Sequence, residues 1–152
     1  MRILITGATG YIGNRLIPIL LNEGHHLICT VRDIARIEHL YAKEENIEFV
    51  EIDFLKADSL SSIPFEFDIA FYLIHSMSNP AKEFHILEER CAFNFKRALE
   101  KTTVKQVIYL SGITNDTKLS KHLLSRKNVE KTLHSNKYAL TTFKAVSYTH
   151  LT

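Results

Sequence analysis

A glycine-rich segment near the amino terminus has the residue types and spacing of a phosphate-binding turn. Thr6-Gly7-Ala8-Thr9-Gly10-Tyr11-Ile12-Gly13 follows a short apolar run and precedes a helical pattern. Gly7 suits a tight turn, Gly10 lets backbone N–H groups approach phosphate oxygens, and Gly13 lets the helix pack close to the strands of the sheet. The positive end of the helix dipole adds to the attraction for an anion. An ordinary turn explains one or two such glycines, but three in this context indicate a pyrophosphate site formed by Gly7, Thr9, Gly10, Tyr11, Ile12 and Gly13.

Arg32 lies about 20 residues beyond this turn, where dinucleotide-binding folds contact the adenosine ribose. An acidic side chain there would accept a hydrogen bond from the 2′-hydroxyl of NAD, whereas an arginine would pair with the 2′-phosphate of NADP. The order Arg32-Asp33 places the arginine first and favours NADP over NAD. The alternative leaves Arg32 as a solvated loop residue, with Asp33 as a helix cap.

Asp53 and Phe54 follow the third apolar run of the chain. An aspartate at this position can accept a hydrogen bond from the adenine amino group, while the adjacent Phe54 covers the ring. A simple turn at the end of a strand is the alternative interpretation. Both residues are therefore candidates for the adenine site.

Six short apolar runs alternate with amphipathic stretches and predict six strands. Several runs are apolar on successive residues, as parallel strands covered on both faces require. Three helices are predicted between them. The first has a stripe of Ile12, Leu16, Ile19 and Leu20 and is closed by Gly24, the second is capped at Asn79-Pro80 and has a stripe from Phe84 to Leu99, and the third lies at about Ser120 to His134. We therefore predict an α/β Rossmann-type doubly wound parallel sheet in the order 3-2-1-4-5-6, with helices on both faces. The predicted strands are Arg2–Thr6, Leu27–Val31, Ile47–Ile52, Ile69–Ile74, Val107–Leu110 and Ala139–Phe143.

Composition limits the class of protein. The 152 residues are 45% hydrophobic, which favours one domain, and the formal charge of +2 gives no indication of nucleic-acid binding. No apolar run is long enough to span a bilayer, and the start lacks the pattern of a secretory signal. Cys29 and Cys91 lie in apolar periodic segments, which predicts reduced core residues. These features predict a cytoplasmic protein.

The residues from Thr6 to Gly13, together with Arg32 and Asp53, resemble the short-chain dehydrogenase/reductase superfamily. The segments 72–77 (YLIHSM) and 119–126 (LSKHLLSR) are similar to its atypical, NmrA-like branch of NAD(P)-binding proteins. In such relatives the loop after strand four passes beside the nicotinamide ribose. The alternative for His75 is a helix cap or a bond to a carbonyl. The resemblance implies cofactor contacts from Leu73, Ile74, His75 and Ser76.

The same resemblance identifies weaker catalytic candidates. Standard reductases of the superfamily use a serine after strand five and a Tyr-x-x-x-Lys pair, whose lysine lowers the pKa of the tyrosine that protonates a carbonyl oxygen. Ser111 matches the serine, but the pair is absent and the matching helix has His122 and Arg126. A histidine can donate a proton near neutrality, although a neighbouring arginine favours its neutral form. His122 and Arg126 are candidates for catalysis or for a structural or cofactor-contact role.

Full-length relatives are expected to continue into a carboxyl-terminal region that forms the substrate pocket. The closing residues 147–152 lack the glycine-turn character expected after Ala145 and look like a read-through of adapter DNA. We therefore expect an NAD(P)-binding domain at residues 1–145, a non-native tail at 146–152, and an absent substrate region.

The leading hypothesis is the NAD(P)-binding domain of an atypical short-chain oxidoreductase. In the full-length protein it would serve hydride transfer between NADPH and an unidentified small carbonyl-type substrate. The alternative, favoured by the missing Tyr-x-x-x-Lys pair, is a non-catalytic NAD(P)-binding redox sensor or assembly factor. A nucleotide-sugar epimerase is a weaker third hypothesis, because that reaction normally depends on the same tyrosine.

Overall fold

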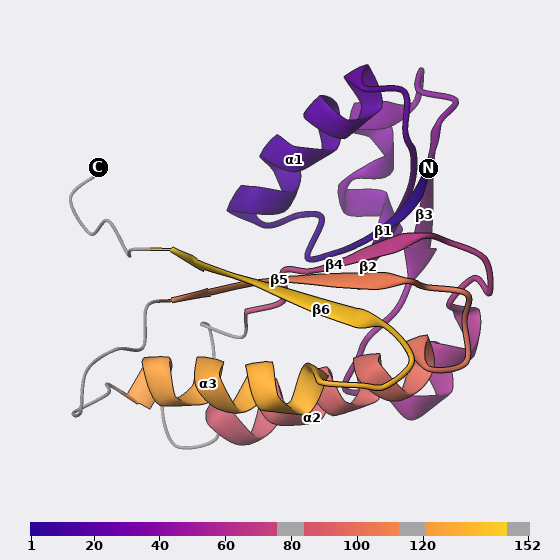
Figure 1. The fold of residues 1–152 in the computed structure, drawn as a ribbon. Helices are drawn as coiled ribbons and strands as arrows, with labels where there is room; N and C mark the ends of the chain where they lie inside the picture. Colours follow the sequence, from indigo (N-terminus) through magenta and orange to yellow (C-terminus); the bar gives the residue numbers. More distant parts are fainter. Residues whose placement is uncertain (76–83, 113–120, 146–152) are drawn as a thin grey trace.

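The computed structural model describes residues 1–75, 84–112 and 121–145, with only the backbone of residues 121 and 122. Its centre is a six-stranded parallel sheet in the order β3-β2-β1-β4-β5-β6 (Figure 1). The predicted fold class and strand order are therefore confirmed. The strands are β1 (Arg2–Thr6), β2 (His26–Val31), β3 (Ile47–Glu51), β4 (Ile69–Tyr72), β5 (Gln106–Gly112) and β6 (Ala139–Ala145).

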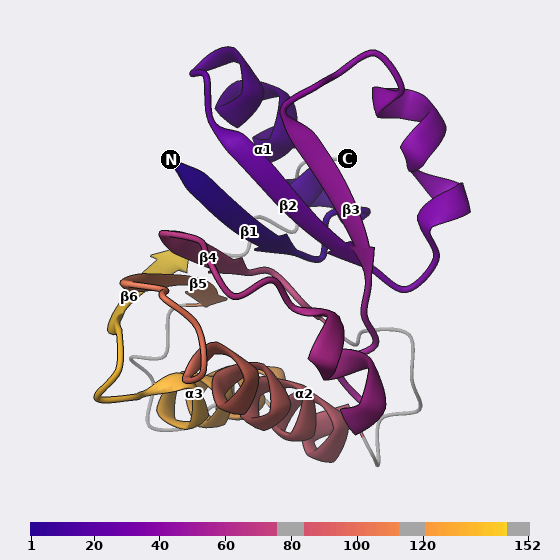
Figure 2. The ribbon, with the colours of Figure 1, turned by 90° about the vertical axis from the view of Figure 1, so that its right-hand side faces the viewer.

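Helices cover both faces of the sheet. Helix α1 (Tyr11–Asn22) lies on one face, whereas α2 (Phe84–Leu99) and α3 (Lys121–Leu133) lie side by side on the other (Figures 1 and 2). The described chain also forms three short 3-10 helices: η1 (Ile34–Arg36), η2 (Glu38–Tyr41) and η3 (Ala57–Ser62). The helix predicted at about 120–134 is found as α3, whose described limits differ from the predicted ones by one residue at each end. The expected cap at Asn79-Pro80 lies outside the described residues.

The core consists of two apolar layers, one on each face of the sheet. Ile3 and Ile5 of β1 pack with Ile17 of α1, while Leu4 between them packs toward α2 and α3. This alternation is why β1 is apolar on successive residues: each of its faces is covered by a helix. Cys29 and Cys91 are buried free thiols, one in each layer, as predicted.

The buried face of α1 differs from the predicted stripe. Gly13 and Ile17 are buried, whereas Ile12 and Ile19, which the periodicity placed on the inner face, are 42% and 59% exposed. The close approach of Gly13 to the preceding turn sets the rotation of the helix, so the inward face is shifted by about one residue. Its end is as predicted, because Gly24 follows the cap Glu23 with a φ of +75°.

Three strand ends differ by two residues from the sequence prediction, and the other limits agree to within one residue. β4 ends at Tyr72 rather than Ile74, β5 extends to Gly112 rather than Leu110, and β6 extends to Ala145 rather than Phe143. Residues 73–75 leave the sheet because β4 pairs with β1 only as far as Phe71 and Ile5. The apolar run continues past the strand, so composition alone does not mark its end.

No helix within the described ranges is both long enough and apolar enough to cross a membrane. The same residues contain no cluster of three or more histidine, cysteine, aspartate or glutamate side chains suited to a metal ion.

Candidate functional site

A groove of about 380 Å³ lies at the carboxyl ends of β1 to β4. Every predicted cofactor residue that the structure describes lines this one groove, and Ser76 lies outside the described residues. The remaining lining residues are Thr30, Val31, Ile52, Leu55, Cys91 and Leu110. The predicted residues at the groove are Gly7, Thr9, Gly10, Tyr11, Ile12, Gly13, Arg32, Asp53, Phe54, Leu73, Ile74 and His75.

The glycine turn forms one wall of the groove, and at two of its glycines a side chain would not fit. Gly7 has a φ of +67°, and a Cβ there would lie 2.7 Å from the carbonyl oxygen of Leu73. A Cβ on Gly13 would collide with the backbone of Gly7 and Ala8. Gly13 therefore lets α1 start directly against the turn, rather than against a strand as the spacing suggested. The turn closes through a 2.9 Å hydrogen bond from Gly10 N–H to Gly7 O.

The amino terminus of α1 opens onto the same groove. The first helical hydrogen bond that reaches back to the cap runs from Asn14 N–H to Gly10 O. The N–H groups of Tyr11, Ile12 and Gly13 precede it and have no carbonyl one turn back. Gly10 at the cap has no side chain to accept from them, and the first turn holds no acidic residue. This end of the helix is therefore available for an anion.

Thr6 joins the glycine turn to the loop after β4. Its side chain is fully buried; Oγ1 donates to Phe71 O and accepts from Leu73 N–H, each at 3.0 Å. The hydroxyl continues the β1–β4 ladder beyond the last backbone pair, which holds Leu73 against Gly7. Nothing in the sequence indicates this contact, because its partners lie more than 60 residues apart.

Arg32 lies at the edge of the groove with an exposed side chain. The following residue, Asp33, turns away to cap η1 and accepts from Ala35 N–H at 3.1 Å through Oδ1. The cap predicted for Asp33 is thus found, whereas the contact of Arg32 with a 2′-phosphate stays a prediction. Asp33 is the cap, and Arg32 is the charged side chain at the groove.

Arg36 is a second basic residue in this region that the sequence reasoning missed. With Asn14 and Thr9 it lines a smaller cavity of about 250 Å³ next to the groove. Thr9 borders both cavities. The signal in the sequence was the spacing Arg32-x-x-x-Arg36, and the structure places one of these arginines at each of the two cavities.

Asp53 shapes the turn after β3 as well as lining the groove. Its Oδ1 accepts from Leu55 N–H at 3.0 Å, and its backbone is held by the hydroxyl of Ser59. Phe54 is only 4% exposed, and its ring lies 5.7 Å from that of Phe95 in the core. Phe54 therefore supports the wall of the groove from below and does not lie over it as a cover.

Cys91 contributes a thiol to the groove from α2. Burial is the main reason that its pKa is raised to about 11. The carboxylates of Asp53 and Glu88 raise it further, whereas Arg32 and Arg90 lower it. The thiol is therefore protonated near neutral pH, which makes it an apolar wall residue rather than a nucleophile.

Two of the catalytic candidates, Ser111 and Arg126, do not line the groove. Ser111 is 1% exposed, and its Oγ lies 3.5 Å from Gly112 O. Arg126 donates from Nη1 to Leu110 O, and its own carbonyl accepts from the hydroxyl of Tyr109. These bonds tie α3 to β5, which is the structural alternative for Arg126. The side chain of His122 lies outside the described residues.

Residues 7–151 match a family of proteins described as NAD(P)H-binding. The chain belongs to this family. Its cofactor is therefore a nicotinamide dinucleotide, and the resemblance to NAD(P)-binding short-chain reductases is confirmed.

Two curated proteins are similar to this NAD(P)H-binding chain over part of their length. UDP-glucose 4-epimerase of Mycolicibacterium smegmatis is 37% identical over 84 residues, covering 51% of this chain and 26% of the epimerase. Photosystem II assembly factor Ycf39 of Synechocystis is 23% identical over 111 residues, covering 73% of this chain and 33% of that protein. The chain thus spans about a quarter to a third of these relatives.

Solved structures share the fold of this NAD(P)H-binding chain. Triphenylmethane reductase of Citrobacter, in complex with NADP(H), superposes with a TM-score of 0.80 at 19% identity. The alignment covers 98% of this chain and 50% of the reductase. At this identity the comparison concerns the fold alone.

Proposed function

We propose that this chain binds NADP in preference to NAD, with the 2′-phosphate held by Arg32. The observation that carries the proposal is that the two adjacent residues have different surroundings. Arg32 lines the groove, whereas the carboxylate of Asp33 caps η1. The acidic group that would accept from the 2′-hydroxyl of NAD is therefore turned away. Arg36 adds a second positive charge next to the same turn.

The rest of the groove suits the other parts of the dinucleotide. The open N–H groups at the start of α1 would hold the pyrophosphate, and the space left by Gly7 and Gly13 lets it approach the backbone. Asp53 would accept from the adenine amino group through Oδ2, which lies 3.9 Å from Nζ of the exposed Lys56, while Oδ1 accepts from Leu55 N–H. Leu73, Ile74 and His75 would then lie at the nicotinamide end, because they follow β4, which is on the opposite side of β1 from β2 and β3.

Calorimetric titration of Arg32→Ala with NADPH and with NADH tests the cofactor preference. A hydrogen bond to a charged group contributes about 1.5–3 kcal/mol, so the affinity for NADPH should fall about 10- to 100-fold. The affinity for NADH should stay within about two-fold. Arg97→Ala is the matched control, since Arg97 is an exposed arginine of α2 outside the groove. Unchanged discrimination in Arg32→Ala would remove the proposed 2′-phosphate contact.

We further propose that the full-length protein is an oxidoreductase acting on a small carbonyl-type substrate in the cytoplasm. The bound cofactor supplies the hydride, while this chain binds the dinucleotide and fixes its orientation. The test follows nicotinamide absorbance with the full-length protein and a panel of small aldehydes, ketones and quinones. Oxidation of NADPH that depends on one of these compounds supports the proposal, and no oxidation with any of them contradicts it.

A non-catalytic role is the second candidate, because a relative at 23% identity is a photosystem assembly factor and this chain has no Tyr-x-x-x-Lys pair. Such a protein would bind the dinucleotide and change its affinity for a partner with the redox state. NADPH binding without turnover, together with a partner retained by one redox form only, would favour it. The similarity to an epimerase carries less weight, since that chemistry normally depends on the missing tyrosine.

A further inference from the structure

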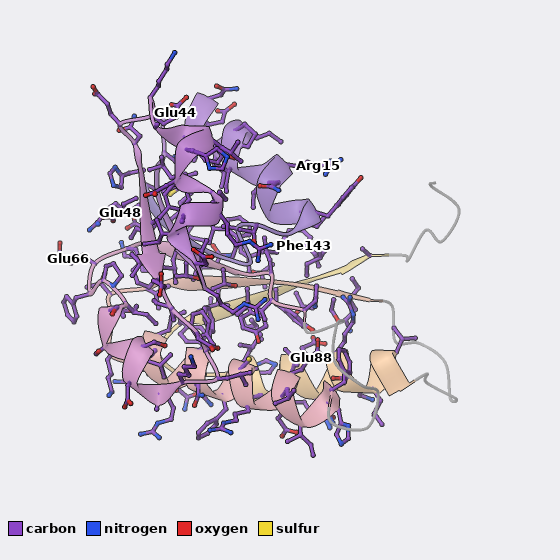
Figure 3. All side chains as sticks on the ribbon, turned by 180° about the vertical axis from the view of Figure 1, so that it is seen from behind. Arg15, Glu44, Glu48, Glu66, Glu88 and Phe143 are labelled. Carbon is purple, nitrogen blue, oxygen red and sulfur yellow. The ribbon has the colours of Figure 1, made fainter. Side chains whose placement is uncertain are left out.

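Glu88 is a buried carboxylate that the periodicity of α2 did not predict. It is 4% exposed, and Figure 3 shows it between the helix layer and the sheet. Its Oε2 accepts a 2.7 Å hydrogen bond from Ser125 Oγ on α3. A buried charge is costly unless polar partners compensate for it, so such a residue in a helix stripe calls for a specific reason.

The other carboxylate oxygen faces a residue of the groove. Glu88 Oε1 lies 3.9 Å from Nδ1 of His75, whose side chain is 27% exposed. His75 lines the groove at the end of the loop after β4. Ser125 thus holds one oxygen of the carboxylate while the other faces the imidazole ring. The three side chains come from α3, α2 and the β4 loop, and tertiary packing alone brings them together.

The negative charge of Glu88 acts on a whole set of neighbours beneath the groove. It contributes to the raised pKa of Tyr72 and of Tyr109, both buried phenols, and to that of Cys91 one turn along α2. In each case burial is the larger cause. The thiol and the two phenols therefore stay protonated near neutral pH.

We propose that Glu88 is a positioning residue that sets the tautomer and ring orientation of His75 for proton transfer at the nicotinamide end of the groove. A carboxylate beside Nδ1 favours the proton on that nitrogen, as in other carboxylate–histidine pairs. The neutral ring then carries its lone pair on Nε2. The 3.9 Å separation is longer than a hydrogen bond, but such contacts commonly tighten once a ligand is bound.

This role rests on the proposed function, because the nicotinamide end has meaning only if the dinucleotide binds in the groove. When a carbonyl is reduced there, its carbon receives the hydride and its oxygen receives the proton from Nε2 of the imidazolium ring. The ring becomes neutral and keeps the proton on Nδ1, facing Glu88. In the reverse direction Nε2 accepts the proton of a hydroxyl. The pair would thereby supply the proton transfer for which this chain has no Tyr-x-x-x-Lys pair.

The tautomer of His75 can be read directly from long-range 1H–15N correlation spectra of the whole chain labelled with 15N-histidine. His75→Asn identifies the signals. In the neutral ring we expect the proton predominantly on Nδ1, and Glu88→Gln should shift the population toward Nε2–H. Glu89→Gln is the matched control, since Glu89 is the exposed neighbour on the same helix, and it should leave the spectrum unchanged.

The wild-type spectrum decides the matter even if Glu88→Gln fails to fold. A neutral His75 with its proton on Nε2 would overturn the proposal. Ser125→Ala gives a second perturbation, and a partial loss of the Nδ1–H tautomer is expected because the carboxylate loses its anchor.

NADPH binding, followed by nicotinamide fluorescence, separates this inference from the proposed function. Binding together with an Nδ1–H tautomer supports both. Binding with an Nε2–H tautomer overturns the role of Glu88 and leaves the cofactor assignment intact. A folded wild-type chain that does not bind NADPH removes the proposed function, and the proton-transfer role of His75 with it.

Discussion

The buried hydroxyl of Thr6 gives a sharp test of how the groove is held together. Thr6→Val keeps the shape of the side chain but removes the donor to Phe71 O and the acceptor for Leu73 N–H. An unsatisfied buried backbone group costs about 1–3 kcal/mol. Both partners lie where the β1–β4 ladder ends, so we expect the free energy of unfolding to fall by about 2–3 kcal/mol.

Thr30→Val is the matched control on the neighbouring strand. Thr30 is also buried, but its hydroxyl makes one long contact, 3.5 Å to Ile5 O. Its removal should cost less than about 1 kcal/mol. Urea unfolding followed by far-ultraviolet circular dichroism measures both variants, and it suits this chain because the sequence has no tryptophan.

Equal losses in the two variants would refute the reasoning, since they would show that the Thr6 bridge contributes no more than an ordinary buried threonine. A further expectation is weaker NADPH binding by Thr6→Val, because Leu73 would no longer be held against Gly7. Wild-type affinity in a destabilised Thr6→Val variant would place the cofactor away from this loop.

Two other predictions concern the backbone of the turn and the response to pH. Gly7→Ala should lower the free energy of unfolding by more than the about 1–2 kcal/mol that a left-handed alanine costs, because its Cβ would lie 2.7 Å from Leu73 O, and it should abolish NADPH binding. Urea unfolding and calorimetry measure these two losses. Burial raises the pKa of Cys91 from 9.0 to about 11 and that of Cys29 to about 12. The unfolded chain loses these protons first, so stability should fall as the pH rises from about 9 to 11, as urea titrations across this range would show.

Each of these predictions has its own control. Gly24→Ala has the same kind of φ, +75°, with no atom within 4 Å of the added Cβ, so it isolates the backbone cost from the contact with Leu73. Losses of equal size in Gly7→Ala and Gly24→Ala would contradict the proposed clash. For the pH prediction, Cys91→Ala should flatten the decline, and a stability that does not change up to about pH 11 would count against the burial of both thiols.

Much of the fold could be predicted from the sequence because its signals are local. The six apolar runs, the glycine spacing and the stripe of α2 each depend on residues close together in the chain, and they give the sheet order and both helix layers. Gly7 and Arg32 directly follow predicted strands, so their position at the groove could also be predicted from the sequence. The exposed Ile12 and Ile19 mark the limit of this reasoning, because periodicity does not specify how a helix is rotated about its axis.

The interactions that hold the site together depend on contacts between distant parts of the chain. Thr6 meets Leu73, and Glu88 meets Ser125 and His75, only because parallel strands bring their carboxyl ends to one edge and two helices share one face. From the sequence alone, a carboxylate next to an apolar stripe is expected to be exposed, because the polar partners that allow its burial are not known. The sequence by itself determined the sheet, the turn and the class of cofactor, because local geometry and spacing encode them. Only the tertiary structure decided which polar side chains are paired, because pairing depends on distances that spacing along the chain does not define.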